Sequence, residues 1–410
     1  MHTPRSIIRP LLLLGVVALL VGCRAEDARF RMDMVYVRKQ ENATEIPFTR
    51  AQLLNLSNVL AAVFGTPDDP DILIDGDIGL HEIVDLTNLK MAAGPVGSDE
   101  MGFPHGLYRE HCSHCHGVTG NGLGPTAAFL NPYPRDYRQG IYKFKSTPKG
   151  SRPTTEDLKT VLINGVQGTA MPSFALLADD EIDALVDYVK YLSVRGKIER
   201  DLIFEVADEL EEKELLVDPE EPDDGLETVK MYLTAEVRKW ASASNEATAV
   251  PAPPASSSDE DRLDSLARGR ELFHGTLANC VKCHGETALG DGQTTDYDQW
   301  TIEIFTKEPQ QPGIGEFVAL GALKPRNILP RNLRHGVYRG GRRPIDLYWR
   351  VRNGIDGTPM PAATMKQSGQ KGLTEADIWH LIDYVRSLPY EPLSNPHYGG
   401  HEAVVERQRL

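Results

Sequence analysis

Two segments of the chain carry apolar residues at helical spacing. Within residues 179–192, and again within residues 375–388, apolar side chains recur every three or four positions. This spacing places them on one face of a helix, so both segments are predicted to be amphipathic helices with one buried face. The apolar positions are Ile182, Leu185, Val189 and Leu192 in the first segment, and Ile378, Leu381, Val385 and Leu388 in the second.

Each of these two helices closes one copy of a longer internal repeat. Both copies have the order C-x-x-C-H, loop, helix, Met-Pro and helix. A set of motifs that recurs in one order indicates two domains of the same fold. The matched segments are CSHCHG and CVKCHG at 112–117 and 280–285, PRDYRQGIY and PRNLRHGVY at 134–142 and 330–338, and DLKTVLINGVQGTAMPSF and DLYWRVRNGIDGTPMPAA at 157–174 and 346–363.

The N-terminus has the pattern of an export signal. Residues 11–22 form an apolar run that follows Arg5 and Arg9, and the run is too short to cross a bilayer as a helix. It ends in Leu-Val-Gly-Cys at residues 20–23, which resembles a bacterial lipobox and implies a lipid on the Cys23 thiol. The alternatives are an ordinary signal peptide with an incidental cysteine, or a short membrane anchor.

Length and charge narrow the class of protein. A chain of 410 residues is long enough for two or three domains. Its formal net charge of -15 argues against a nucleic-acid partner, because such proteins present a basic face. The same charge would steer basic partners toward the protein.

The cysteines are paired in two identical contexts. Apart from Cys23, they form two C-x-x-C pairs that are each followed by His-Gly, and C-x-x-C-H is typical of c-type haem attachment. Two thiols on one helical turn can each add to a vinyl group of haem, and the following imidazole can then bind the iron. The paired cysteines are Cys112 and Cys115 in the first copy, and Cys280 and Cys283 in the second.

Zinc and redox-dithiol sites are the competing interpretations of these pairs. One zinc ion bound by all four cysteines would need the pairs closer together than the 164 residues that separate them. Two separate zinc sites would need further ligands, which His111 and His114 could supply in the first copy only. A thioredoxin-like dithiol would need a βαβ context, which is absent from the pattern.

The order of motifs resembles the class I cytochrome c family, and the resemblance covers about 230 residues. It implies two small all-α domains, in each of which a first and a last helix cross beside a haem. It also implies that His116 is the proximal iron ligand of haem one, held by Cys112 and Cys115. His284 would be that of haem two, which Cys280 and Cys283 would hold.

The resemblance places a methionine on the far side of each iron. Met171 and Met360 each precede proline in a Gly-Thr-x-Met-Pro loop, and proline stiffens such a loop. A His/Met pair of ligands raises the reduction potential of a haem. The alternatives are that both methionines only pack in the core, or that the haems have two histidine ligands, with His105, His274 or His335 as candidates.

Residues around the ligands carry further expectations from the family. Pro125 follows His116 by nine residues, and its carbonyl is expected to accept the free N–H of that histidine. The second copy lacks this proline and carries an insertion at 293–329, so the partner of His284 is open and the two haems are expected to differ in potential. Arg135 and Arg331 would bind haem propionates or remain solvated loop charges.

Four aromatic residues complete the family pattern. Tyr108 and Phe273 resemble the aromatic residue of the first helix, and Tyr188 and Tyr384 resemble its partner on the last helix. The distance in sequence from Phe273 to its cysteine pair is longer, which predicts a bend or insertion before Cys280.

The predicted fold is all-α, with two tandem class I cytochrome c domains, an N-terminal extension and an acidic inter-domain linker. The acidic stretch at 199–227 is either a solvated helix or a docking surface, and the Pro-, Ala- and Ser-rich residues 244–261 are expected to stay unfolded and let the domains move. A rigid pair of domains is the alternative. The predicted divisions are a lipoprotein signal peptide at 1–23, an extension at 24–100, domain 1 at 101–198, an acidic helical segment and linker at 199–261, domain 2 at 262–390 and a tail at 391–410.

These features predict an exported, lipid-anchored electron carrier with two covalent haems on the periplasmic or outer-surface side. It would transfer electrons between membrane respiratory complexes, for example from a quinol-oxidising complex to a terminal oxidase, or exchange them with small redox carriers. It would act alone or as a bound subunit. The alternative is a dihaem peroxidase, which needs one haem with an open or displaceable distal side.

Overall fold

The computed structural model describes residues 27–72, 79–211, 213–305, 313–390 and 394, so the predicted signal peptide, Cys23 and nearly all of the predicted tail lie outside the described residues. The fold is all-α, as predicted, with one short antiparallel hairpin of β1 (Gly97–Ser98) and β2 (Pro104–His105). The α-helices are α2 Met34–Thr44, α3 Arg50–Phe64, α4 Leu86–Ala92, α5 Leu107–His111, α6 Ser113–His116, α7 Thr155–Asn164, α8 Asp179–Asp208, α9 Asp223–Ser242, α10 Asp259–His274, α11 Val281–His284, α12 Gln299–Phe305, α13 Ile314–Ala319, α14 Pro344–Asn353 and α15 Glu375–Ser387, and the 3-10 helices are η1 Leu80–Glu82, η2 Ala127–Phe129, η3 Tyr137–Gln139, η4 Ala243–Glu246 and η5 Leu333–His335. None of the described helices is long and apolar enough to cross a membrane.

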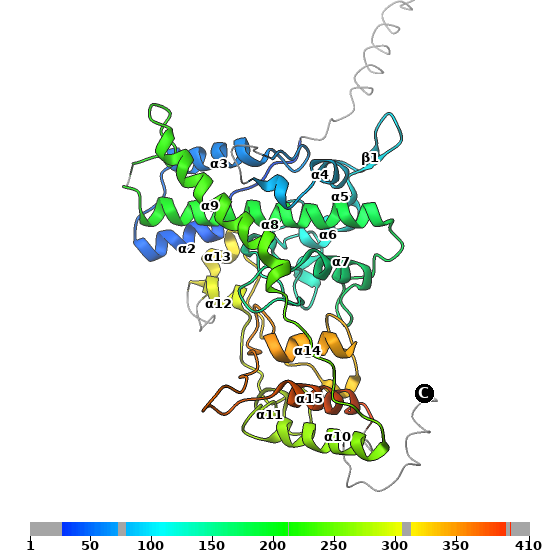
Figure 1. Cartoon of the computed structure of the whole chain (residues 1–410). Coiled ribbons are helices and arrows are strands. Elements are labelled where there is room, and N and C mark those ends of the chain that lie inside the picture. Colours follow the sequence, from blue (N-terminus) through cyan, green and yellow to red (C-terminus); the bar gives the residue numbers. More distant parts are fainter. Residues whose placement is uncertain (1–26, 73–78, 212, 306–312, 391–393, 395–410) are drawn as a thin grey trace, which may run out of the picture.

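Helix α8 is the centre of the first hydrophobic core (Figure 1). Its predicted apolar face is buried, and α2, α3 and α4 of the N-terminal extension all pack against α8. Leu56 of α3 and Leu89 of α4 are fully buried in the same core as Leu185. The extension is therefore part of the body of domain 1.

The acidic stretch that begins at residue 199 is not solvated at its start, which corrects one of the two readings of that stretch. Helix α8 continues to Asp208, and Glu199 is completely buried within it. The Glu199 carboxylate accepts a 2.6 Å hydrogen bond from the Asp33 backbone amide and pairs with the Arg195 guanidinium. A carboxylate can be buried when such partners replace its water.

Removing the Glu199 carboxylate should strongly destabilise the protein. We expect Glu199→Ala to lower the free energy of unfolding by roughly 3–5 kcal/mol, because a buried charged partner, here Arg195, is left uncompensated. Asp201→Ala breaks a more exposed pair with Lys197, which is also spaced i,i+4 on α8, and should cost less than about 1 kcal/mol. Urea denaturation of both variants checks this, and equal losses would contradict it.

A second core forms around α10, α14 and α15 (Figure 1). Helices α10 and α15 cross closely at Gly269, where an added Cβ would lie 2.0 Å from the His380 carbonyl oxygen. The crossing brings Phe273 against Tyr384, with ring centroids 5.4 Å apart. In domain 1 the matching rings of Tyr108 and Tyr188 lie 4.9 Å apart, so both expected aromatic pairs form.

The two domains contact each other directly. The loop at 145–150 of domain 1 holds the Met360 loop of domain 2, since Lys145 Nζ lies 3.1 Å from an Asp356 carboxylate oxygen that also accepts a 2.9 Å bond from the Gly150 amide. The Asn353 side-chain amide donates to the Ser146 carbonyl at 2.9 Å. These contacts join a loop of domain 1 to the end of α14 and the loop that follows it.

The linker also differs from the expectation of an unfolded chain. The Thr248 amide donates to the Ser146 carbonyl at 3.0 Å, and the Thr248 hydroxyl donates to Asn353 Oδ1 at 2.9 Å. The Pro251 carbonyl accepts a 3.1 Å bond from the Trp379 indole N–H. The start of the linker is thus bound to both domains, and the structure favours the rigid pair over the mobile one.

A rigid pair predicts a single inter-domain distance. Spin labels at Leu176 in domain 1 and Glu286 in domain 2, both strongly exposed, should give one narrow distance distribution by pulsed electron paramagnetic resonance. Replacing Lys145 and Asp356 with alanine should broaden that distribution, because the pair anchors the interface. A distribution that is already broad in the unmodified chain would restore the mobile interpretation.

Candidate functional site

Each C-x-x-C-H motif forms one short helical turn. The His116 amide donates to the Cys112 carbonyl at 2.9 Å, and the His284 amide donates to the Cys280 carbonyl at the same distance. Burial raises the pKa of the Cys112 thiol to about 12 and that of the Cys280 thiol to about 12. In domain 1 the Tyr108 hydroxyl donates to the Gly117 carbonyl at 3.0 Å and holds the end of the turn.

In both domains the histidine that follows the cysteines is partly buried and oriented by a main-chain carbonyl. His116 Nδ1 lies 3.0 Å from the Arg135 carbonyl oxygen, and His284 Nδ1 lies 3.2 Å from the Arg331 carbonyl oxygen. Burial lowers the pKa of His116 to about 4 and also lowers the pKa of His284. A neutral imidazole that donates from Nδ1 keeps the lone pair of Nε2 available for a metal.

The expected role of Pro125 is therefore wrong. The carbonyl beside His116 belongs to Arg135, and the second domain has the same partner at Arg331 although 293–329 is inserted before it. The sequence feature that indicates this contact is the Pro-Arg pair with which the loop begins in both copies. The missing proline in domain 2 therefore gives no reason for the two proximal histidines to differ.

The two Met-Pro loops have the same hydrogen bonds. In domain 1 the Met171 amide donates to the Thr169 hydroxyl at 3.1 Å, and that hydroxyl donates to the Val166 carbonyl at 2.7 Å. In domain 2 the Met360 amide donates to the Thr358 hydroxyl at 3.2 Å, which in turn donates at 2.8 Å to a carbonyl three residues earlier. Threonine thus fixes the backbone just before each methionine, which explains the shared Gly-Thr-x-Met-Pro sequence.

One of the alternative histidines, His274, has both of its ring nitrogens occupied. Both ring nitrogens of His274 lie within 3.1 Å of backbone carbonyls, those of Arg270 and Glu286. His105 is bound through Nδ1 to the Pro95 carbonyl at 2.7 Å. His335 is exposed and lies 3.3 Å from the Asn332 side chain. Within the described part of the chain, no three His, Cys, Asp or Glu side chains form a group that could hold a metal ion.

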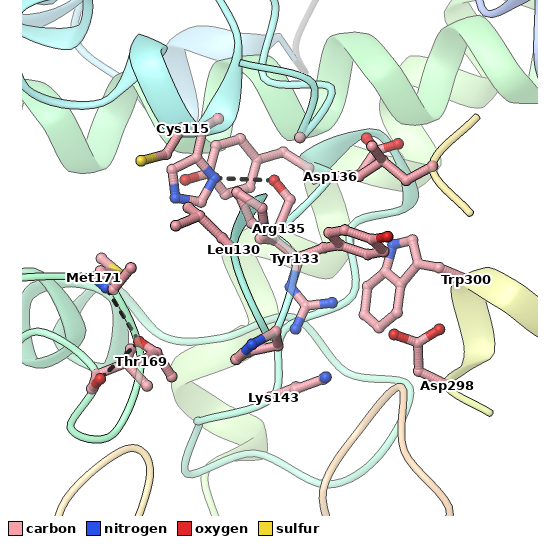
Figure 2. A pocket seen from close by; sticks show the side chains of 18 of the residues that line it. Cys115, Leu130, Tyr133, Arg135, Asp136, Lys143, Thr169, Met171, Asp298 and Trp300 are labelled. Carbon is pink, nitrogen blue, oxygen red and sulfur yellow. Dashed lines mark hydrogen bonds between the residues drawn. The ribbon is translucent and has the colours of Figure 1, made fainter. Parts of the chain in front are cut away.

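A cavity of about 650 Å³ opens between the C-x-x-C-H turn and the Met-Pro loop of domain 1. Its wall includes His111, Cys115, His116 and Met171, so the candidate residues of domain 1 meet at one site (Figure 2). A cavity of this size is typical of a small-molecule or cofactor site. The ring of Tyr137 stacks on His116 with centroids 5.0 Å apart and closes the wall behind the imidazole.

Cationic and polar side chains gather at one part of this cavity, apart from Met171 (Figure 2). Arg135 stacks on the indole of Trp300 at 3.8 Å, and Lys143 Nζ lies 5.5 Å from the same ring. Burial lowers the pKa of Arg135 to about 10 and that of Lys143 to about 7. Asp298 is the carboxylate beside them.

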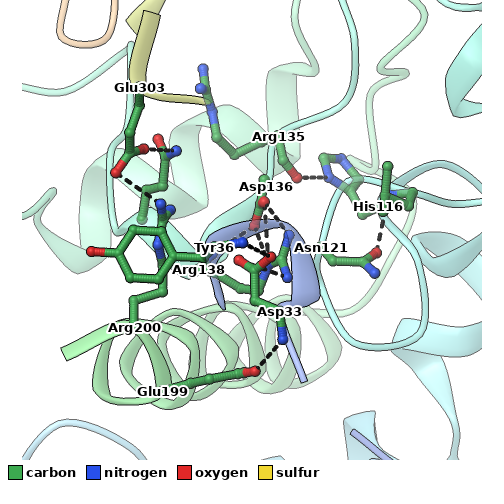
Figure 3. A network of polar contacts seen from close by, with 12 residues as sticks. Asp33, Tyr36, His116, Asn121, Arg135, Asp136, Arg138, Glu199, Arg200 and Glu303 are labelled. Atoms are coloured by element: carbon green, nitrogen blue, oxygen red, sulfur yellow. Dashed lines mark hydrogen bonds and ion pairs between the residues drawn. The ribbon is translucent and has the colours of Figure 1, made fainter. Parts of the chain in front are cut away.

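The loop that carries Arg135 is fixed by a buried ion network (Figure 3). Arg138 binds Asp136 through two guanidinium nitrogens and lies 3.0 Å from an Asp33 carboxylate oxygen. The charges of Asp136 and Asp33 raise the pKa of Arg138 against the opposing effect of burial. The N-terminal extension thus holds the loop whose carbonyl orients His116.

The residues fit a haem in chemical type. The site offers two thiols, a neutral imidazole and a thioether in domain 1, and the same set in domain 2. Of the buried nitrogens without a hydrogen-bond partner among the described residues, three belong to the cavity wall: Trp300 Nε1, Arg331 Nε and Arg339 Nε. Such orphaned donors next to cations suit an anionic group such as a carboxylate.

Two family models match the two domains of the chain. The family described as cytochrome C oxidase, cbb3-type, subunit III matches residues 104–189, and the family described as cytochrome c matches residues 266–389. No curated protein matches the chain. Among solved structures, a chain of the reducing HAO-like protein complex of Kuenenia stuttgartiensis is 24% identical with a TM-score of 0.45, over 72% of this chain and 98% of that chain.

Proposed function

Because the chain carries two class I c-type cytochrome domains in tandem and such domains transfer electrons, we propose that it relays electrons between membrane respiratory complexes through two covalently bound haems. The complexes would be a quinol-oxidising complex and a terminal oxidase, or small redox carriers would take the place of one of them. The chain would act alone or as a bound subunit.

One observation carries this proposal. Each domain combines a partly buried histidine, oriented through Nδ1, with a methionine on a loop that threonine hydrogen bonds fix in the same way. When bound, haem would supply the one-electron chemistry. His116 and Met171 would hold one iron, and His284 and Met360 the other, with Cys112, Cys115, Cys280 and Cys283 as the covalent attachments. With both ligands bound, neither iron would have an open position for a substrate.

Peroxidase activity is the alternative function, and ligand binding separates the two. We expect the reduced protein to bind little carbon monoxide and to turn over hydrogen peroxide no faster than a carrier with two fixed ligands on each iron. Electron exchange with a soluble redox partner should remain fast by stopped-flow absorbance. Stoichiometric carbon monoxide binding at one haem, with rapid peroxide turnover, would replace the carrier by the peroxidase.

The proposed membrane attachment rests on the lipobox-like sequence at residues 20–23. Two lipid chains on one cysteine are enough for stable anchoring. We expect Cys23→Ala to move the protein from the membrane fraction to the soluble fraction while both haems remain attached. Metabolic labelling with a radioactive fatty acid should mark the unmodified chain only. Fractionation that is the same for both proteins would refute the anchor.

A further inference from the structure

The cavity of domain 1 is closed in part by domain 2. Its wall includes Trp300 of α12, which belongs to the 293–329 insertion that the first copy lacks, and Arg331 and Arg339 from the Pro-Arg loop of domain 2 and the residues just after it. The insertion is anchored on domain 1 by Arg326, whose guanidinium donates to the Leu130 and Ala128 carbonyls at 2.5 and 2.8 Å. A second anchor is Glu303, which lies 2.8 Å from Arg200 of α8.

Trp300 is fixed at the point where the two domains meet. Its indole contacts the Arg135 guanidinium. It also packs against Gly357 in the Met360 loop, where an added Cβ would lie 2.4 Å from the ring. The Gln299 amide donates to the Gly357 carbonyl at 3.2 Å and holds the start of α12 on that loop. In the same way, Arg331 of domain 2 contacts Gly168 in the Met171 loop of domain 1.

The indole N–H of Trp300 has no acceptor in this position. Trp300 Nε1 is buried and without a hydrogen-bond partner among the described residues, whereas the indole nitrogens of Trp240, Trp349 and Trp379 each donate at 3.0 or 3.1 Å. A buried donor without an acceptor is unfavourable, because it has lost its hydrogen bonds to water. An anionic acceptor in the cavity would remove that cost and would also pair with the partly buried Arg135 and Lys143.

We propose that the insertion of domain 2 completes the haem site of domain 1, with Trp300 and the neighbouring Arg135 and Lys143 receiving the haem carboxylates. Trp300 is then a positioning residue supplied by the other domain, and it sets the potential of haem one. This rests on the proposed function, since it requires a haem in domain 1. Domain 1 has no inserted segment at the corresponding place, so it supplies no counterpart of Trp300 to domain 2.

The effect on potential follows from charge. An N–H donor and two cations next to the carboxylates offset their negative charge, and negative charge near the iron favours the ferric state. Loss of the donor should therefore lower the potential of haem one. At a fixed applied potential, a tenfold change in the ratio of reduced to oxidised haem corresponds to a shift of 59 mV in the reduction potential of a one-electron couple.

The test is spectroelectrochemical titration of the full chain with both haems. Trp300→Phe keeps an aromatic ring over Arg135 and removes the N–H. It should lower one of the two reduction potentials, so that the ratio of reduced to oxidised haem at a fixed applied potential falls several-fold. Lys143→Met should lower the same potential, and it keeps the test informative if Trp300→Phe does not fold. Trp349→Phe is the matched control, because its indole donates to the Thr248 carbonyl instead, and it should move neither potential.

The titration should show two redox waves, one for each haem. Met171→His identifies the wave of haem one, since replacement of a methionine ligand lowers the potential of its own haem strongly. The inference is overturned if Trp300→Phe and Lys143→Met leave that wave in place, if they move only the other wave, or if Trp349→Phe moves it as much. If Met171→His itself moves neither wave, the ligand assignment of the proposed function fails instead, which separates the two conclusions.

Discussion

Replacing both Cys112 and Cys115 with alanine should leave one covalent haem per chain instead of two. The two thiols lie on one helical turn with His116, and only thioether bonds would keep haem attached after denaturation. The pyridine haemochrome assay should then give half the haem per mole of protein. Haem-stained gels of the denatured protein should still show a band, because domain 2 keeps Cys280 and Cys283.

Two controls complete this experiment. Cys23→Ala removes a cysteine outside both motifs and should leave two haems. The double variant Cys280→Ala, Cys283→Ala should retain only the haem of domain 1. A double variant that still carries two covalent haems, or unmodified protein that carries zinc in place of iron, would refute the attachment sites. The assay reports stoichiometry, so it does not depend on knowing the electron donor or acceptor.

Replacing Met171 or Met360 with alanine should remove the weak near-infrared absorption of one His/Met-ligated ferric haem and halve the band of the whole protein. The potential of the affected haem should fall sharply, because a His/Met pair raises it. Each loop is held by its own threonine hydrogen bonds, so the other haem should keep its spectrum.

Matched controls for the methionines exist in both cores. Met91 packs on the first core and Met365 on the second, and both are partly buried but lie outside the Gly-Thr-x-Met-Pro loops. Alanine at either position should leave the band intact at a cost in stability. An unmodified spectrum of the two-histidine type would reject methionine ligation.

Local motifs were readable from the sequence because their spacing alone determines their geometry. The C-x-x-C-H turn, the threonine before each methionine and the apolar faces of α8 and α15 involve residues close together in the chain. The partner of His116 was harder to predict, because a backbone carbonyl leaves no trace in residue type. Only the recurrence of Pro-Arg at residues 134–135 and 330–331 pointed to it.

Contacts between distant segments were missed for a different reason. Glu199 appeared to belong to a solvated acidic run, yet its partners include the backbone of Asp33, 166 residues away. Trp300 lies in a segment without a counterpart in the first copy, so the repeat could not indicate its contact with Arg135. The residues after Ala247 have the composition of a free linker, but two tryptophans of domain 2 donate hydrogen bonds to Thr248 and Pro251.

The cover that α12 forms over the cavity of domain 1 has a consequence for biosynthesis. Trp300, Arg331 and Arg339 of domain 2 form part of the cavity wall, so we expect a macrocycle to enter more readily before the two domains dock. Domain 1 precedes these residues by more than a hundred positions, so it emerges first during synthesis and export. We therefore expect maturation to be ordered, with cofactor attachment to Cys112 and Cys115 completed while the second half of the chain is still undocked.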